Sequence, residues 1–583
     1  MSSVYGDFQR ELQGWRRQYS GRPKDELSHL LLLALEREQI VTVAYREAMI
    51  STRVQAMPVS HEVRALLSSA LLWIWRDEEM HSTYVRGVLL RLGSGRLQLQ
   101  ALAEQVAGSV AGWATAVRHH LTWTEAPASR ALAALFVAAG WAAGRVPAAV
   151  WQHLRHGNFV EYCRFNIEAE ETARLCWERM VELAGEVRPE LVEDFDRMAA
   201  DEERHAQVFR RLMESFDDRD RPRIGADELR AGLAAVSPYF VSRRREPQTV
   251  HVVEGGDKLA ALFHVLQEMG IEKRLQSRPR VIIKPTFMMA YHRRDSSVYT
   301  DVEMVEALAE WLMQHGAGEV RVGEAPNLYD LWYGNRTVEN VAGYVRYRSP
   351  VIDLSAERIS HEYARGVGQS TVAKAWAEAD LRILFGKLRA HPVDQVSFTL
   401  GAAEGIGTPC HDKVFLDKMA DRHTAAVMAL DDFPPDFALL EGWDAAPDTL
   451  MGVIACPDPL QPRRLYAGRD ALAVDLVAAR HVGLSHWSRS PLLRMACHWF
   501  GAPEVRVVGC DTPVAGWRGP YQNEWTSLLS LLAQPVYTLA SKRGAVFVPQ
   551  MDVEAFPPLR AESTLLRWRR ASLRRLLGYR LAP

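Results

Sequence analysis

The pentapeptides DEEMH (residues 77–81) and DEERH (residues 201–205) place the same charged cluster at two distant points of the chain. In each of them a glutamate is followed three residues later by a histidine, as Glu78 with His81 and Glu202 with His205. Residues three apart lie on the same face of a helix. Because the order and the spacing recur, the two copies predict two halves of one site.

Apolar residues flank both clusters at helical spacing. The first stripe comprises Leu67, Leu71, Ile74, Glu78, His81 and Val85, and the second comprises Leu191, Phe195, Met198, Glu202, His205, Phe209 and Leu212. Steps of three and four residues put each set on one helix face, so the glutamate and the histidine point into an apolar core. A buried carboxylate needs a partner, and a metal ion would supply the missing positive charge. The remaining acidic residues fall off the stripes and are predicted to face solvent: Asp77, Glu79, Asp201 and Glu203.

Two further helices offer a glutamate in phase with an apolar stripe. One stripe is Leu31, Leu35, Glu38, Thr42 and Tyr45, and the other is Cys163, Ile167, Glu170, Ala173, Trp177 and Met180. They select Glu38 and Glu170, while Glu168 and Glu171 fit a core face less well and remain the alternatives on the third helix. We expect Tyr45 to be a core tyrosine that is hydrogen-bonded to a ligand carboxylate.

Four carboxylates and two imidazoles are the ligands of a two-metal carboxylate site in a four-helix bundle. This set suits iron or manganese better than copper or structural zinc. Iron is the first choice, and a di-iron(II) centre with open positions can reduce dioxygen. No iron–sulfur cluster is expected, because the six cysteines (163, 176, 410, 456, 497 and 510) include no C-x-x-C pair. They are predicted to be reduced and mostly buried.

The helix order Glu, Glu-x-x-His, Glu, Glu-x-x-His resembles the ferritin-like di-iron carboxylate superfamily. The segments ALEREQIVTVAY (34–45) and EETARLCW (170–177) are similar to its rubrerythrin-type members, and the likeness runs from about Ser28 to Phe216. The resemblance implies that Glu38 and Glu170 are terminal or bridging carboxylates and that Glu78 and Glu202 bridge the metals. It also implies that His81 and His205 each bind one metal.

The character of the sequence changes near residue 245. Before this point Leu, Ala, Glu and Arg recur at helical spacing, and beyond it β-branched runs such as RVIIKP (280–285) alternate with helical stretches. We therefore predict a multidomain chain, with an all-α ferritin-like four-helix bundle and extra helices over residues 1–245. An α/β domain follows over residues 246–583 and ends in a basic amphipathic helix. The connection from Gly93 to Asn158 could wall off a substrate pocket or only add helices to the bundle.

The carboxy-terminal half resembles the family catalogued as domain of unknown function 362 (DUF362), from about Arg280 to Gly509. The likeness rests on an ordered series: VIIKPTFM, TDVEMVEALAEWL, VGEAPN, VIDL, ADLRILFGKLRAH, TLGAAEGIGTP and AGRDALAVDLVA. It implies that the basic residues Lys284, Lys387 and His391 could bind a carboxylate or phosphate at strand ends. The iron–sulfur cysteine motifs that many members carry are absent, and Ala403-Glu404 stands where the family usually has Lys-Asn.

Two motifs of this half have simpler interpretations from the residues alone. The glycines of TLGAAEGIGTP, at positions 401, 405 and 407, do not fit a phosphate-loop spacing, so a tight turn is favoured. Asp470 and Asp475 could be acidic site residues, although Asp470 could equally cap a helix.

The bulk composition excludes several classes of function. With 70 basic and 72 acidic side chains, the formal charge of −2 attracts neither nucleic acid nor an anionic membrane. The amino terminus lacks a secretory h-region, and the apolar run 131–144 falls short of the ~20 residues that span a bilayer, so we expect a cytoplasmic protein. The sequence is compatible with a homodimer but does not fix the oligomeric state.

Three functions remain. The first is a non-heme di-iron oxidase or oxygenase that uses dioxygen to oxidise a small metabolite, with an external electron donor and a carboxy-terminal domain that binds substrate or partner. The second is a rubrerythrin-like peroxide reductase or iron-handling protein. The third is a helical scaffold joined to an anion-binding module, in which the carboxylates pair with arginines instead of metals. Manganese remains the alternative to iron in the first two.

Overall fold

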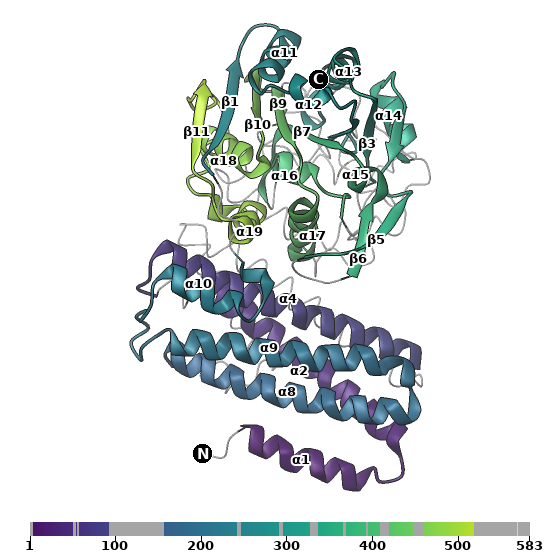
Figure 1. The fold of residues 1–583 in the computed structure, drawn as a ribbon, viewed down its shortest axis with the longest axis vertical. Coiled ribbons are helices and arrows are strands. Elements are labelled where there is room, and N and C mark those ends of the chain that lie inside the picture. Colours follow the sequence, from purple (N-terminus) through teal and green to yellow (C-terminus); the bar gives the residue numbers. More distant parts are fainter. Residues whose placement is uncertain are drawn as a thin grey trace. The chain divides into compact units, whose positions relative to one another are not determined.

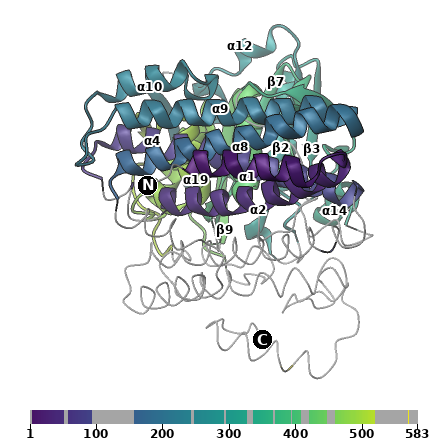
Figure 2. The same ribbon diagram turned by 90° about the horizontal axis from the view of Figure 1, so that it is seen from below.

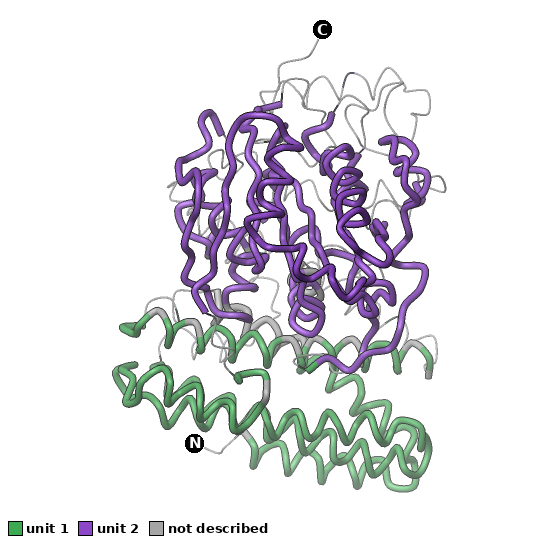
Figure 3. Tube along the Cα trace, turned by 45° about the horizontal axis from the view of Figure 1, so that its top comes forward, with its two compact units in different colours: residues 1–242, 364–368 green, residues 243–363, 369–583 purple. Residues whose placement is uncertain are grey.

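The computed structural model divides the chain into two compact units (Figure 3). The first unit comprises Met1–Ser242 with Ala364–Gly368, and the second comprises Arg243–Tyr363 with Gln369–Pro583. The structure describes residues 4–50, 54, 57–92, 99, 157–241, 246–290, 295–326, 336–364, 369–391, 394–407, 419–446, 459–517 and 568, with only the backbone at 39–50. Within these residues, none of the helices has both the length and the apolar character needed to cross a membrane.

The named elements of the first unit are all helices in the described residues, and an isolated antiparallel bridge joins Phe216 to Pro222. Its elements are α1 (Val4–Gln18), α2 (Pro23–Ile50), α4 (His61–Leu92), α8 (Phe159–Val187), η1 (Pro189–Leu191), α9 (Val192–Glu214), α10 (Ala226–Ala234) and η2 (Pro238–Phe240). α2 packs along α4 and α8 packs along α9, and the two pairs meet through α2 with α8 and α4 with α9 (Figures 1 and 2). α1 lies along α8. The predicted four-helix bundle with extra helices is confirmed.

Helix phase explains why these segments pack as they do. The predicted stripe of α4 is its buried face: Leu67, Leu71, Ile74 and Val85 are all 0% exposed. The stripe of α9 is buried in the same way along its whole length. α8 begins after Asn158, whose side chain accepts a hydrogen bond from the backbone N–H of Glu161 and so caps the helix. The predicted stripes of α4 and α9 therefore face the centre of the bundle, as do the described stripe residues Leu31, Leu35 and Glu38 of α2 and the buried residues Cys163, Glu170, Trp177 and Met180 of α8.

Several predictions fall outside the described residues. They concern the side chain of Tyr45, the connection between α4 and α8 apart from Leu99 and residues 157–158, Cys410, Cys456, and the basic tail apart from Trp568. The other four cysteines are free thiols, and three of them are buried, which agrees with the prediction for these positions.

In the described residues, the second unit is built on a mixed sheet of nine strands. They are β1 (Gln248–Glu254), β2 (Arg280–Pro285), β3 (Glu319–Glu324), β4 (Val351–Asp353), β7 (Leu381–His391), β8 (Gln395–Ser397), β9 (Phe437–Ala446), β10 (Arg464–Gly468) and β11 (Val505–Gly509). The order is β11-β1-β10-β9-β7-β2-β3-β4, with β8 paired to β7. β2, β3, β4, β7 and β9 are mutually parallel and β10 runs against its neighbours. β5 (Arg358–Glu362) and β6 (Gln369–Ala373) form a separate antiparallel pair.

Helices cover both faces of this sheet. They are α11 (Lys258–Glu268), α12 (Glu272–Leu275), α13 (Val302–Gln314), α14 (Val338–Val345), α15 (Lys374–Ala377), α16 (Thr399–Ala402), α17 (Met419–Asp432), α18 (Ala471–His481) and α19 (Pro491–Phe500). α11 and α13 share one apolar core with alternate strand residues such as Ile283 and Leu439. Gly386 and Gly468 face the opposite way, where an added Cβ would lie 2.9 Å from Phe398 and from Val474 respectively. The predicted α/β architecture is confirmed.

The motifs TLGAAEGIGTP and AGRDALAVD have structural roles in this unit. The first forms α16 and a turn through Gly405, whose φ of +88° suits a residue without a Cβ, so the turn interpretation is confirmed. Asp470 caps α18 by accepting a hydrogen bond from the N–H of Ala473. Asp475 lies inside α18 and accepts hydrogen bonds from the N–H groups of Thr399 and Leu400, both at 2.9 Å. It thereby holds the start of α16 against α18.

Candidate metal centre

The bundle brings six predicted side chains together in two overlapping groups of four. One group is Glu38, Glu78, His81 and Glu202, and the other is Glu78, Glu170, Glu202 and His205. Within each group, one nitrogen or oxygen atom per residue lies within 4.8 Å of the corresponding atom of every other member. Glu78 of α4 and Glu202 of α9 belong to both groups, so each can reach both halves of the site. All six residues are at most 3% exposed.

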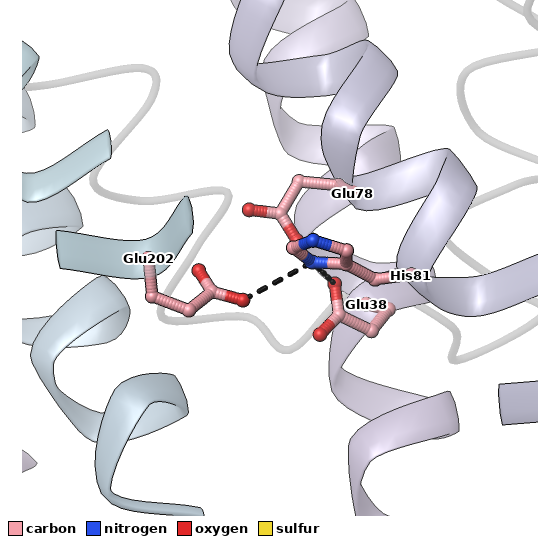
Figure 4. Close-up of side chains that lie close together, drawn as sticks. All are labelled: Glu38, Glu78, His81 and Glu202. Atoms are coloured by element: carbon pink, nitrogen blue, oxygen red, sulfur yellow. Dashed lines mark ion pairs between the residues drawn. The ribbon is translucent and has the colours of Figure 1, made fainter. Parts of the chain in front are cut away.

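Each histidine faces the carboxylates through Nδ1. His81 Nδ1 lies 3.2 Å from Glu202, 3.9 Å from Glu78 and 4.0 Å from Glu38 (Figure 4). His205 Nδ1 lies 3.2 Å from Glu78, 3.5 Å from Glu202 and 3.6 Å from Glu170. The closest carboxylate to each imidazole therefore comes from the other pentapeptide. The two copies form one site of approximate two-fold symmetry, which explains why the motif recurs.

Asp77 and Asp201 were predicted to face solvent, and this prediction is wrong. Both are only 4% exposed. Asp201 Oδ2 lies 3.3 Å from Nε2 of His81, and Asp77 Oδ2 lies 3.3 Å from Nε2 of His205. On an isolated helix, Asp77 and Asp201 would point about 100° away from the neighbouring core residues Glu78 and Glu202. In the bundle, this side of each helix is covered by the neighbouring helix, so both aspartates are buried.

This second contact orients the imidazole rings. An Nε2–H that donates to an aspartate leaves the lone pair of Nδ1 directed at the cluster, which is the arrangement that metal-binding histidines require. The aspartate of one pentapeptide thus positions the histidine of the other. Asp201 is held in turn by an ion pair with Arg204.

The other acidic neighbours lie apart from the cluster. The side chain of Glu203 is 37% exposed and pairs with Arg174 and Arg210, as expected for a residue off the stripe. Glu171 pairs with Arg210 at 2.5 Å. On α8 it is Glu170 that enters the cluster, and Glu168 belongs to neither group. The side chain of Glu79 is outside the described residues.

Two tryptophans contact the site, and neither was singled out by the sequence. Trp177 donates its indole N–H to Glu202 Oε1 at 2.9 Å, and its ring lies edge-on to His81 with the centroids 5.8 Å apart. Trp73 packs edge-on against His205 at 5.1 Å. Trp177 lies on the same predicted stripe as Glu170, and this shared stripe could have indicated that it lies near the site. Trp73 lies next to the stripe of α4, so the sequence did not indicate its position.

Burial and mutual repulsion shift the protonation of the cluster. Burial raises the pKa values of Glu38 and Glu170 well above the usual range, and the negative charge of Glu78 adds to both shifts. Burial also acts on Glu202, but its contacts with His205 and His81 outweigh it, so the pKa of Glu202 is lowered. The pKa values of His81 and His205 are raised because neighbouring carboxylates outweigh burial. In the metal-free cluster, protons therefore compensate part of the negative charge.

The residues fit a pair of divalent cations. Five polar atoms of the cluster are buried without a hydrogen-bond partner in the described part of the chain: Glu38 Oε2, Glu78 Oε1, His81 Nδ1, Glu202 Oε2 and His205 Nδ1. Buried polar atoms of this kind destabilise a protein unless something binds them. Two divalent cations would carry as much positive charge as the four carboxylates carry negative charge. The donor set of carboxylate oxygens and imidazole nitrogens suits iron or manganese.

A four-helix bundle with one glutamate on each of two helices and Glu-x-x-His on each of the other two defines the class of dinuclear carboxylate proteins. The rubrerythrin family model matches residues 161–243, and the model for the domain of unknown function DUF362 matches residues 281–480. The chain therefore contains a segment similar to rubrerythrin, within the ferritin-like bundle, and a segment similar to DUF362, in the order that the resemblances implied. The first match begins within α8 and includes Glu170, Glu202 and His205. Searches of curated proteins and of solved structures give no significant match.

The basic residues expected to bind an anion are each engaged within the α/β unit. Lys284 forms a buried ion pair with Glu324, and Lys387 Nζ lies 2.6 Å from Glu441 Oε2. Both lysine side chains are only 1% exposed. Nδ1 of His391 accepts a hydrogen bond from the N–H of Asp394. Because a carboxylate already neutralises each ammonium group, this arrangement argues against an anion-binding role for the two lysines.

Proposed function

We propose that the helical unit is a non-heme di-iron oxidoreductase that uses dioxygen to oxidise a small molecule. The observation that carries this proposal is the pair of four-residue groups that share Glu78 and Glu202. A mononuclear site would need only one of these groups, and in a salt-bridged scaffold two protonated imidazoles would balance at most half of the charge of the four carboxylates. The rubrerythrin-type match supports a di-iron centre and leaves the reaction open.

The side chains have separable roles in this proposal. Glu78 and Glu202 would bridge two iron ions, Glu38 with His81 would complete one coordination sphere, and Glu170 with His205 would complete the other. Iron in such a site supplies the electrons and the Lewis acidity for the reduction of dioxygen.

Side chains around the site would orient the metal ligands and keep bulk water away from them. Asp77 and Asp201 hold the two imidazoles through Nε2, and Trp177 fixes Glu202 through its indole N–H. The ligands are buried among apolar side chains, which excludes bulk water from the cluster. An external reductant would return the metals to the ferrous state, and we propose the α/β unit as the part that binds the substrate or a partner.

Oxygen uptake by the ferrous protein tests this function. The protein is loaded with iron(II) without oxygen and then exposed to oxygen with and without pools of candidate metabolites, and the products are analysed by mass spectrometry. Oxygen consumption that yields an oxidised organic product is the expected result. The matched control is the double variant Glu78→Ala, Glu202→Ala, which should neither hold iron nor consume oxygen.

The same experiment separates the competing functions. Turnover of hydrogen peroxide to water, without any organic product from oxygen, would identify a rubrerythrin-like peroxide reductase instead. Iron content equal to that of the double variant would show that the bundle is a scaffold.

A further inference from the structure

The dinuclear site is connected to a partly exposed tyrosine by a row of aromatic rings. The ring of His81 lies 5.8 Å from that of Trp177, Trp177 lies 5.8 Å from Phe195, and Phe195 lies 6.3 Å from Tyr84. These centroid distances are those of rings in direct contact. Trp177 and Phe195 are at most 1% exposed, whereas Tyr84 is only partly buried. The row thus runs from the cluster toward solvent within the helical unit.

The far end of the row carries an acceptor for a proton. The phenol of Tyr84 donates a hydrogen bond to Oδ2 of Asp194, and Oδ1 of the same carboxylate lies 2.7 Å from Arg197. The ion pair with Arg197 holds this carboxylate in place beside the phenol. A tyrosine that loses an electron becomes strongly acidic, so a carboxylate in hydrogen-bond contact lets the phenol release its proton in the same event.

We propose that Trp177 and Tyr84 carry single oxidising equivalents from the dinuclear site to the protein surface, an inference that rests on the proposed function. Trp177 gives one electron to the oxidised metal site and keeps its N–H bonded to Glu202. Tyr84 then returns one electron to Trp177 and passes its proton to Asp194. An external one-electron reductant finally restores the phenol, which takes its proton back from Asp194.

A second aromatic contact supplies an internal comparison. Trp73 packs against His205 at 5.1 Å and against Tyr239 at 6.2 Å, so Tyr239 is also linked to the site. Tyr239 is only 4% exposed, however, and has little access to an external reductant. The geometry therefore assigns the surface exit to Tyr84.

Electron paramagnetic resonance of the iron-loaded full-length protein tests the relay. The protein is treated with hydrogen peroxide in the absence of organic substrate and frozen within milliseconds, after growth on ring-deuterated tyrosine to identify tyrosyl radicals. We expect a tyrosyl signal in the parent protein and in Tyr239→Phe, and loss of that signal in Tyr84→Phe. Oxygen adducts on Trp177, detected by peptide mass spectrometry, should increase in Tyr84→Phe because the oxidising equivalent is trapped there.

Two further variants probe the steps of the relay. Asp194→Asn keeps the phenol but removes the anionic proton acceptor, so the tyrosyl signal should form more slowly. Ascorbate added to the parent protein should quench the signal without changing the iron content.

The outcomes distinguish the relay from the proposed function. An undiminished tyrosyl signal in Tyr84→Phe, its loss in Tyr239→Phe, or no radical in protein that holds two coupled irons would overturn the relay and leave the di-iron assignment intact. Failure of the parent protein to bind iron would overturn both.

Discussion

The orientation of each histidine depends on one aspartate from the opposite pentapeptide. Asp77 and Asp201 engage Nε2 of His205 and His81, so both Nδ1 atoms face the cluster. Partners of this kind tune metal affinity although they do not touch the metal.

Replacement of Asp201 by asparagine should therefore weaken iron(II) binding by about 10–100-fold while the fold is retained. The amide has no charge to balance the imidazole and can present an N–H in place of an acceptor. Titration of the metal-free protein with iron(II) or cobalt(II) measures the change. Asp196→Asn is the matched control because Asp196 is an exposed carboxylate on the same helix. Equal affinities of the two variants would refute the positioning role.

Ligands and surface neighbours should respond differently to truncation. His205→Ala removes an imidazole that is fully buried in the cluster, whereas Glu203→Ala removes a carboxylate that is 37% exposed and paired with arginines. We expect the first variant to lose most of its iron and the second to keep nearly all of it. Metal analysis together with circular dichroism checks both, and equal losses in two folded variants would invalidate the assignment.

Proton release should accompany metal binding. The pKa values of Glu38, Glu170 and the two histidines are raised, so the metal-free cluster keeps its protons to a higher pH than the same groups in water would. A metal displaces these protons, so the apparent metal affinity should fall as the pH is lowered. Titration of weakly buffered protein with zinc(II) or iron(II) and a pH indicator measures the release. Affinity that is independent of pH would contradict these protonation states.

At the scale of the helices, the same cluster should destabilise the metal-free bundle. The folded-state pKa of Glu38 lies above its unfolded value, so the stabilising contribution of its protonated form is lost as pH rises from about 4.5 through the raised pKa. Glu38→Gln removes this titration and should raise the thermal stability of the metal-free protein at pH 8. We expect a gain of a few kcal/mol, because the variant no longer buries a carboxylate charge beside Glu78.

Thermal unfolding followed by far-ultraviolet circular dichroism measures this effect. Glu36→Gln is the control, because Glu36 lies on the exposed face of the same helix. Metal should stabilise the parent protein more than Glu38→Gln, since ligands that bind only the folded state raise stability in proportion to their affinity. A less stable Glu38→Gln variant without metal would contradict the account.

Helix phase allowed much of the bundle to be predicted from the sequence. A period of three to four residues is a local property, and it identified Glu38, Glu78, Glu170, Glu202 and both histidines as inward-facing. The positions of Asp77 and Asp201 could not be found in this way, because they lie on the flanks of the stripes. Whether a flank is covered depends on how closely the neighbouring helix approaches, which no single segment encodes.

In the α/β unit, the sequence predicted the fold class but not the contacts of its buried charged residues. Alternation of strand and helix predicted its class, and Asp470 was recognised as a possible helix cap. The order β9-β7-β2-β3 brings Glu324 beside Lys284 and Glu441 beside Lys387, and these pairings depend on strand order and register. The sequence therefore predicted basic residues at strand ends, whereas Lys284 and Lys387 lie within β2 and β7, and it did not show that a carboxylate neutralises each lysine.

For the whole molecule, a substitution that destabilises one unit should leave the stability and metal content of the other unchanged. Lys387→Met leaves Glu441 buried without its ammonium partner, which should destabilise the α/β unit by about 3–5 kcal/mol. The ligands of the metal centre all belong to the helical unit, so iron content should not change. Denaturant unfolding and metal analysis of the full-length variant measure the two effects. Loss of iron in parallel with loss of stability would show that the units depend on each other.

Mössbauer spectroscopy of the full-length protein, reconstituted with isotopically enriched iron and then oxidised, tests the dinuclear centre most directly. The account predicts two iron ions per chain that form a spin-coupled diferric pair, with this spectrum abolished in the double variant Glu78→Ala, Glu202→Ala. Uncoupled mononuclear iron, or no specifically bound iron in correctly folded protein, would contradict it.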